Sequence, residues 1–201
     1  MSEWWTYRPS DFLMFAPRTY YRLIELYNAA VWPAQLVALA AGATLLVLAW
    51  RGRAASPRWV FGLLAFAWAW VGVVFHGRHF VTINWAASWF AGAFLLQALL
   101  WIGLAVRHAG LQWRSDAGSR RLVGLGLIAA AVLLFPLLAP ATGRSWRQAE
   151  LFGLAPDPTV LATLGVLLLL DGARWLRLIC SVLPLGWCVF AVLLQWTMHA
   201  P

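Results

Sequence analysis

Three histidines near the ends of predicted helices have the side chains best suited to metal binding. His76 and His79 are three residues apart, and His199 lies near the end of the chain. Imidazole nitrogens at such a spacing can share a metal ion, and histidines that face each other from separate helices can hold a haem. The sequence has no second H-x-x-H, no C-x-x-C and no E-x-x-H. These histidines are therefore candidate metal ligands, and the alternative is that they are ordinary residues of a membrane interface.

Arginine and glutamate recur in a pattern that occurs twice. The pattern R-x-x-E-L-[YF]-x5-P-x2-L-x2-L begins at Arg22 and again at Arg147, and it places Glu25 and Glu150 at matching positions. Arg and Glu three residues apart on a helix can form an ion pair. We name residues 22–32 and 147–157 the two elbows and expect them to lie on one side of a membrane. They are either structural clamps or the walls of a polar outer vestibule lined by Arg18, Arg22, Glu25, Asn28, Arg147, Glu150 and Asp157.

The elements that position these residues are predicted to be transmembrane helices. Of the 201 residues 63% are hydrophobic and only 11% are charged, whereas a soluble domain has about 25% charged residues. Apolar stretches close to the roughly 20 residues needed to cross a hydrocarbon core recur along the chain. We predict an all-α, polytopic membrane helix bundle, residues 30–201, of about six transmembrane helices. The predicted spans are 30–50, 59–76, 84–106, 121–139, 158–173 and 177–198.

The fifth predicted span is short, and its apolar part could be tilted or re-entrant. Asp157 precedes Pro158, and this pair predicts a helix start because a carboxylate can cap free N–H groups and proline fits the first turn. Together with the second elbow, this span suggests an internal repeat in which the first and last pairs of spans are related hairpins. Gln97 lies inside the third span and is expected to bond to another helix, because an unpaired amide in lipid is costly.

The distribution of charge predicts the orientation in the membrane. The net charge is +8, and all 15 basic residues are arginines. Most of these lie in the connections 51–58, 107–120 and 171–177, which the positive-inside rule places in the cytoplasm. Both termini are then periplasmic. Because the arginines lie at the ends of apolar stretches, lipid headgroups are their expected contacts and nucleic-acid binding is not expected.

Residues 1–29 are predicted to form an interfacial amphipathic segment. This segment mixes aromatic and charged side chains, a composition typical of the headgroup level of a bilayer. It also carries part of a resemblance to a known family. The matching residues are Ser10–Leu13, Pro17–Arg22, Glu25–Asn28, Ile83–Ala87 and Glu150–Thr159.

In these residues the chain resembles an uncharacterised family, a domain of unknown function, of small multi-pass bacterial membrane proteins that are sometimes labelled permease-like. The resemblance implies a location in the bacterial inner membrane and transfers no activity. Three functions remain open. The first is a small-solute permease, the second a non-catalytic membrane subunit or scaffold that docks a partner, and the third a metal- or haem-dependent enzyme. The sequence favours a protein that is not an enzyme and has no cofactor, and a homo-oligomer fits the small number of spans.

Overall fold

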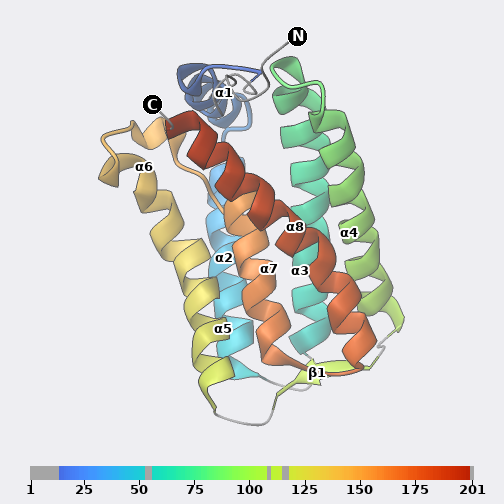
Figure 1. Ribbon diagram of the computed structural model, residues 1–201. Helices are drawn as coiled ribbons and strands as arrows, with labels where there is room; N and C mark the ends of the chain where they lie inside the picture. Colours follow the sequence, from blue (N-terminus) through green and yellow to red (C-terminus); the bar gives the residue numbers. More distant parts are fainter. Residues whose placement is uncertain (1–13, 53–55, 108–109, 115–117, 200–201) are drawn as a thin grey trace.

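The computed structural model describes residues 14–52, 56–107, 110–114 and 118–199, and these form an antiparallel helical bundle. Figure 1 shows α1, α6 and the C-terminal end of α8 together at one end of the bundle. We call this the terminal end, and the opposite end, where β1 lies, the ribbon end. The elements in chain order are α1 (Pro17–Ala30), α2 (Ala34–Arg51), α3 (Ser56–Trp70), η3 (Val71–His79), η4 (Phe80–Thr82), α4 (Ala87–Arg107), β1 (Leu111–Trp113), α5 (Ser119–Ala129), η5 (Ala130–Leu134), η6 (Phe135–Leu137), α6 (Leu138–Ala141), η7 (Trp146–Gln148), α7 (Pro156–Leu169), β2 (Leu170–Gly172) and α8 (Arg174–His199).

Five helices in the described residues are long and apolar enough to cross a membrane. Their bounds are Ala34–Arg51, Pro57–Thr82, Ala87–Arg107, Ser119–Ala141 and Arg174–Met198. The prediction of six spans therefore needs a correction, because residues 158–173 do not form a helix of that length. The helix there, α7, has 14 residues, or about 21 Å at 1.5 Å per residue.

Helix α7 begins and ends differently from the prediction. It begins at Pro156, so Asp157 lies within the first turn of the helix. The N-cap residue is Ala155, and no side-chain hydrogen bond caps the helix there. It ends because Leu170 leaves the helix to begin β2, which pairs antiparallel with β1. Gly172 is required in this ribbon, because it has φ +120° and a Cβ there would overlap the carbonyl oxygen of Gly110.

Helix α7 packs against α3, α5 and α8, and Figure 1 shows it in the middle of the bundle. A helix that is apolar all round and has no polar face is expected in such a central place. Gly165 of α7 meets Gly124 of α5 so closely that a Cβ at residue 165 would lie 2.7 Å from the Gly124 carbonyl oxygen. On another side Trp68 of α3 donates an indole N–H to Thr163 Oγ1 at 2.8 Å. The predicted interhelical bond of Gln97 is also confirmed, since its Nε2 donates to the Cys180 carbonyl of α8 at 3.2 Å.

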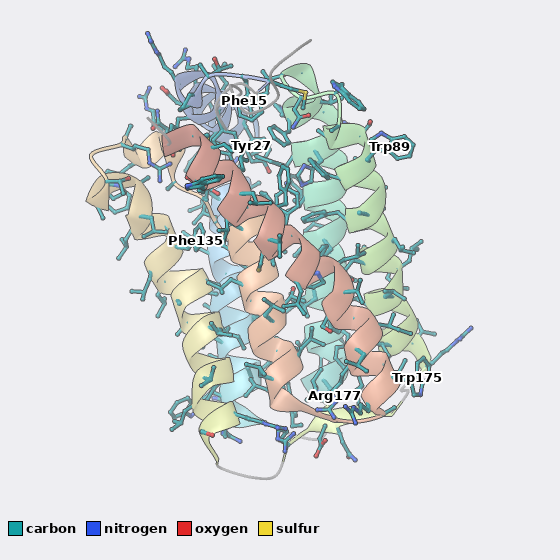
Figure 2. The ribbon with its side chains drawn as sticks, viewed as in Figure 1. Phe15, Tyr27, Trp89, Phe135, Trp175 and Arg177 are labelled. Atoms are coloured by element: carbon teal, nitrogen blue, oxygen red, sulfur yellow. The ribbon has the colours of Figure 1, made fainter. Side chains whose placement is uncertain are left out.

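Exposed tryptophans lie at both ends of the bundle. Trp32 and Trp50 bracket α2, whose 18 residues span about 27 Å. Figure 2 shows Trp89 at the terminal end and Trp175 at the ribbon end. The spacing is close to the roughly 30 Å thickness of a hydrocarbon core, at whose two interfaces tryptophan is enriched.

Candidate functional site

The two elbows enclose a groove at the terminal end. This elbow groove has a volume of about 690 Å³. Asn28 at the end of α1 joins its two walls, because Asn28 Nδ2 donates to the carbonyl oxygens of Arg147 and Ala149 at 2.8 and 2.9 Å. The Asn28 carbonyl in turn accepts a bond from Gln35 Nε2 at 2.7 Å. The polar side chains that line the groove are those of Arg22, Glu25, Asn28, Gln35 and Arg147, and Trp32 and Trp146 complete it.

The first elbow has the predicted ion pair. Arg22 Nη1 lies 3.0 Å from Glu25 Oε1 on successive turns of α1. The hydrogen bond from the Arg22 guanidinium is the main cause that lowers the pKa of Glu25. Glu25 is therefore an anion at neutral pH, and this wall of the groove carries both signs of charge.

The second elbow differs from the first, and its predicted ion pair is wrong. Residues Trp146–Gln148 form a short turn, η7, after which Ala149 is extended. Glu150 consequently points inward, where it is 8% exposed, while Arg147 lies on the exposed side. Arg147 and Glu150 are both described, and no ion pair joins them. The prediction assumed a helix here, and the extended residue removes the i,i+3 relationship on which it depended.

Glu150, which is buried, and Asp157, which is half-buried, form an acidic pair next to the groove. Burial, and secondly the nearby Asp157 carboxylate, raise the pKa of Glu150 to about 8, although the Arg144 guanidinium acts in the opposite direction. Glu150 Oε2 has no hydrogen-bond partner among the described residues. Asp157 Oδ1 accepts a bond from Trp187 Nε1 of α8 at 2.7 Å. The pair can therefore hold a proton close to neutral pH.

Arg144, Tyr20 and Trp187 surround this acidic pair and were not predicted as site residues. The Tyr20 pKa is raised by burial first and then by Glu150 and Asp157, so its phenol remains neutral. The Arg144 guanidinium lies 4.3 Å from the centre of the Tyr21 ring, a cation–π arrangement. The paired tyrosines beside Arg22 are a sequence signal that could have identified Tyr20, whereas no local pattern marks Trp187.

The candidate metal ligands His76 and His79 face different surroundings. His76 is fully buried against aromatic rings, with its ring centre 4.7 Å from that of Phe94 and 5.0 Å from that of Trp187. His79 Nδ1 instead lies 2.9 Å from the Val74 carbonyl oxygen. Both belong to the π-helical turn η3, whose i,i+5 bonds place more residues in each turn than an α-helix does. His76 and His79 are three residues apart, and on this π-helical segment their side chains therefore point in more different directions than they would on an α-helix.

The predicted three-histidine metal site stays a prediction, because the side chain of His199 lies outside what the structure describes. In the described residues, no three His, Cys, Asp or Glu side chains form a group able to hold a metal ion. His79 lines a different groove of about 400 Å³, on the other side of α1. Arg18 lines that groove too, and Arg22 lines both grooves.

The structure thus divides the predicted vestibule into three parts. Arg22, Glu25, Asn28 and Arg147 meet in the elbow groove, the buried Glu150 and the half-buried Asp157 form a separate acidic pair, and Arg18 lies apart with His79. The relationship between the two elbows as an internal repeat stays a prediction, because one is helical and the other is a turn followed by extended chain.

Comparison with known proteins identifies a family and no characterised relative. No curated protein and no solved structure matches the chain. The model of DUF6064, a family of unknown function, matches residues 18–198, which include both elbows and all of the grooves described above. The chain belongs to this family.

Proposed function

We propose that the chain is an integral protein of a bacterial inner membrane, with its ribbon end in the cytoplasm and both termini in the periplasm. The two levels of exposed tryptophan support the insertion. The outward side chains between them are apolar, as in α8, where Val182, Val189 and Val192 are exposed. The arginines support the orientation. Among the described residues, the ribbon end carries Arg51, Arg58, Arg107, Arg114, Arg120, Arg121, Arg174 and Arg177, whereas the terminal end carries the smaller set Arg18, Arg22, Arg78, Arg144 and Arg147.

The function that the geometry supports best is recognition of a small polar solute at the periplasmic face, as in a permease. The elbow groove is the observation that carries this proposal. It has the size of a small-molecule site, and it combines an exposed arginine, a carboxylate held as an anion and an amide with tryptophan side chains. Such a mixture can bind both polar and apolar parts of a small solute.

Two breaks in the surrounding helices are consistent with a transport role. Helix α3 continues into the π-helical turn η3, and α5 continues into η5, which is followed by Pro136 in η6. Such π-helical turns are frequent at functional sites, and a proline removes a backbone donor and allows a kink. Both breaks lie in the halves of these helices that approach the terminal end, so a change in either would alter the walls beneath the groove.

The test is solute uptake by proteoliposomes containing the purified chain, measured over a panel of radiolabelled amino acids, sugars, organic acids and cations. We expect at least one solute to enter faster than in protein-free vesicles. Arg147→Gln should reduce that uptake at least fivefold, because it removes the exposed charge of the groove. Arg78→Gln is the matched control, since Arg78 is an exposed arginine at the same end and lies outside the groove.

Uptake equal to leakage for the whole panel would contradict the permease proposal. The same conclusion would follow if Arg147→Gln and Arg78→Gln had equal effects. A protein that co-purifies in stoichiometric amount from gently solubilised membranes, and whose binding Arg147→Gln abolishes, would instead identify the groove as a docking site of a non-catalytic subunit.

A further inference from the structure

Another groove lies in the ribbon half of the bundle, among α5, α7 and α8. Its volume is about 470 Å³. Leucines from all three helices form its walls, among them Leu127 of α5, Leu164 of α7 and Leu185 of α8. Arg174 and Arg177 in the first turn of α8 lie at its ribbon end. Basic and apolar surfaces thus adjoin in one groove, which we call the leucine groove.

The mouth of the leucine groove has excess positive charge. Arg177 Nη1 donates to the Leu170 carbonyl oxygen at 3.3 Å, and its Nη2 lies 3.8 Å from Asp171 Oδ1. Asp171 is shared, because Arg114 also lies 3.7 Å from it. Among the described residues, the Asp171 carboxylate is thus the one acid beside Arg114 and Arg177, and Arg177 Nε is buried with no hydrogen-bond partner in that part of the chain. Figure 2 shows Arg177 at the ribbon end of α8.

The length of the groove matches one leaflet of a bilayer. Arg174 and Leu185 are its extreme residues on α8, and a separation of eleven positions along a helix corresponds to about 16 Å. Half of a hydrocarbon core of about 30 Å is about 15 Å. An acyl chain whose headgroup lies at the arginines would therefore end near the level of Leu185.

We propose that the leucine groove binds an anionic phospholipid of the cytoplasmic leaflet. Its phosphate lies against Arg174 and Arg177, and one of its acyl chains lies along the leucines of α5, α7 and α8. Basic pockets between transmembrane helices on the cytoplasmic side are suited to such headgroups. A free anion would use the arginines alone and would leave the apolar trough beneath them empty. The proposal rests on the membrane insertion proposed above and is independent of solute recognition at the elbow groove.

The first arm of the test concerns the headgroup. Purified chain in mild detergent is titrated with phosphatidylglycerol or with phosphatidylcholine of identical acyl chains, and bound lipid is counted by native mass spectrometry. We expect tighter binding of phosphatidylglycerol, and Arg174→Gln should weaken it about fivefold, as expected for one arginine at a membrane surface. Arg107→Gln, which changes an exposed arginine at the same end but outside the groove, should have less than a twofold effect.

The second arm concerns the acyl chain. Ser181 lines the groove and is small, so Ser181→Phe should fill the trough and weaken the binding of phosphatidylglycerol at least fivefold. The neighbouring Val182 is 64% exposed and lies outside the groove, which makes Val182→Phe the matched control for added bulk. Neither variant changes the charge at the mouth.

Three results would overturn the proposal. These are equal affinities for the two lipids, equal losses in Arg174→Gln and Arg107→Gln, or unchanged binding in Ser181→Phe.

Inorganic phosphate is the third arm, and competition by phosphate alone at concentrations comparable to those of the lipid would assign the arginines to a free anion instead. Membrane insertion is tested separately by extraction with alkaline carbonate, so release of the chain from membranes would refute the insertion itself without reference to any lipid titration.

Discussion

Helices α7 and α8 follow each other in the chain and are both strongly apolar, yet they occupy opposite environments. Most residues of α7 are buried on every side. In α8, only 11% of the most apolar 18-residue window is buried inside the protein. Lipid and protein interior are equally apolar, so hydrophobicity alone does not distinguish a central helix from a peripheral one. Length and residue type make the difference here.

The residues of α7 have partners on several neighbouring helices. Gly165 allows contact with the α5 backbone, Thr163 accepts the Trp68 indole of α3, and Asp157 accepts the Trp187 indole of α8. By contrast, the hydroxyl groups of Ser181 and Thr197 in α8 bond to carbonyl oxygens of their own helix. Small and hydroxyl-bearing residues thus specify the central position of α7, as they do at other helix interfaces in membranes.

The largest effect is expected from adding bulk at the glycine of α7. Gly165→Leu places a Cβ 2.7 Å from both the Gly124 carbonyl oxygen and Ile128 Cγ1, so α5 and α7 must separate. Overpacking costs about 1–3 kcal/mol and more where backbone must move. We expect a loss of at least 3 kcal/mol, or about 6–12 °C in Tm at this chain length, measured by thermal unfolding in detergent.

Gly186 of α8 provides the control for this change. Nothing lies within 4 Å of a Cβ built there, and leucine has a higher helix propensity than glycine. Gly186→Leu should therefore leave Tm unchanged or raise it slightly. Equal losses in the two variants would show that α8 is as closely packed as α7 and would remove the contrast between them.

The second effect concerns the buried carboxyl group at the entrance to α7. The pKa of Glu150 is raised from about 4.5 to about 8, so the folded state binds its proton more strongly than the unfolded state does. This contribution to stability is fully present below about pH 4.5 and is lost as the pH rises through 8. We expect Tm to fall between pH 5 and pH 8.5, and Glu150→Gln to reduce this fall because its side chain does not ionise. Glu25→Gln, at the half-buried matching position of the first elbow, should retain the fall; a similar reduction in both variants would contradict the assignment to Glu150.

The third effect is the loss of a hydrogen bond between α7 and α3. Thr163→Val removes the acceptor of the Trp68 indole N–H, and both residues are fully buried. A buried donor left without a partner costs about 1–3 kcal/mol, so Tm should fall by about 2–12 °C. Thr197→Val in α8 removes only a hydroxyl that bonds to Leu194 of the same helix, and its expected effect is below 0.5 kcal/mol. The comparison fails if Thr197→Val is the more damaging change.

The bundle could be predicted from the sequence to the extent that apolar length and charge determine it. Five long spans and the location of α1 and the C-terminal end of α8 at one end of the bundle follow from hydropathy and the arginine connections. The shortness of α7 could be predicted, because its apolar stretch extends only from Pro158 to Leu170. Its central place could not, because it depends on contacts with distant residues, such as those of Gly165 with Gly124 and of Thr163 with Trp68. The elbows show a similar limit, since the repeated pattern identified residues that meet in a groove, while the extended Ala149 that buries Glu150 has no signal in that pattern.

The smallest effect is expected on the outward face of α8, and it bears on oligomeric state. Val189 and Val192 are 62% and 67% exposed, so Val189→Ala with Val192→Ala exchanges one lipid-facing apolar surface for a smaller one. The change in stability should stay within about 0.5 kcal/mol, and the elution volume in size-exclusion chromatography should be unchanged. Val160→Ala and Val166→Ala in α7 remove the same atoms from fully buried positions and should together cost at least 2 kcal/mol, because cavities remain. The two α8 substitutions could instead be as destabilising as the two α7 substitutions and also shift the protein to a smaller species. A second copy of the chain would then cover α8, and the contrast between the two helices would hold only for the isolated protomer.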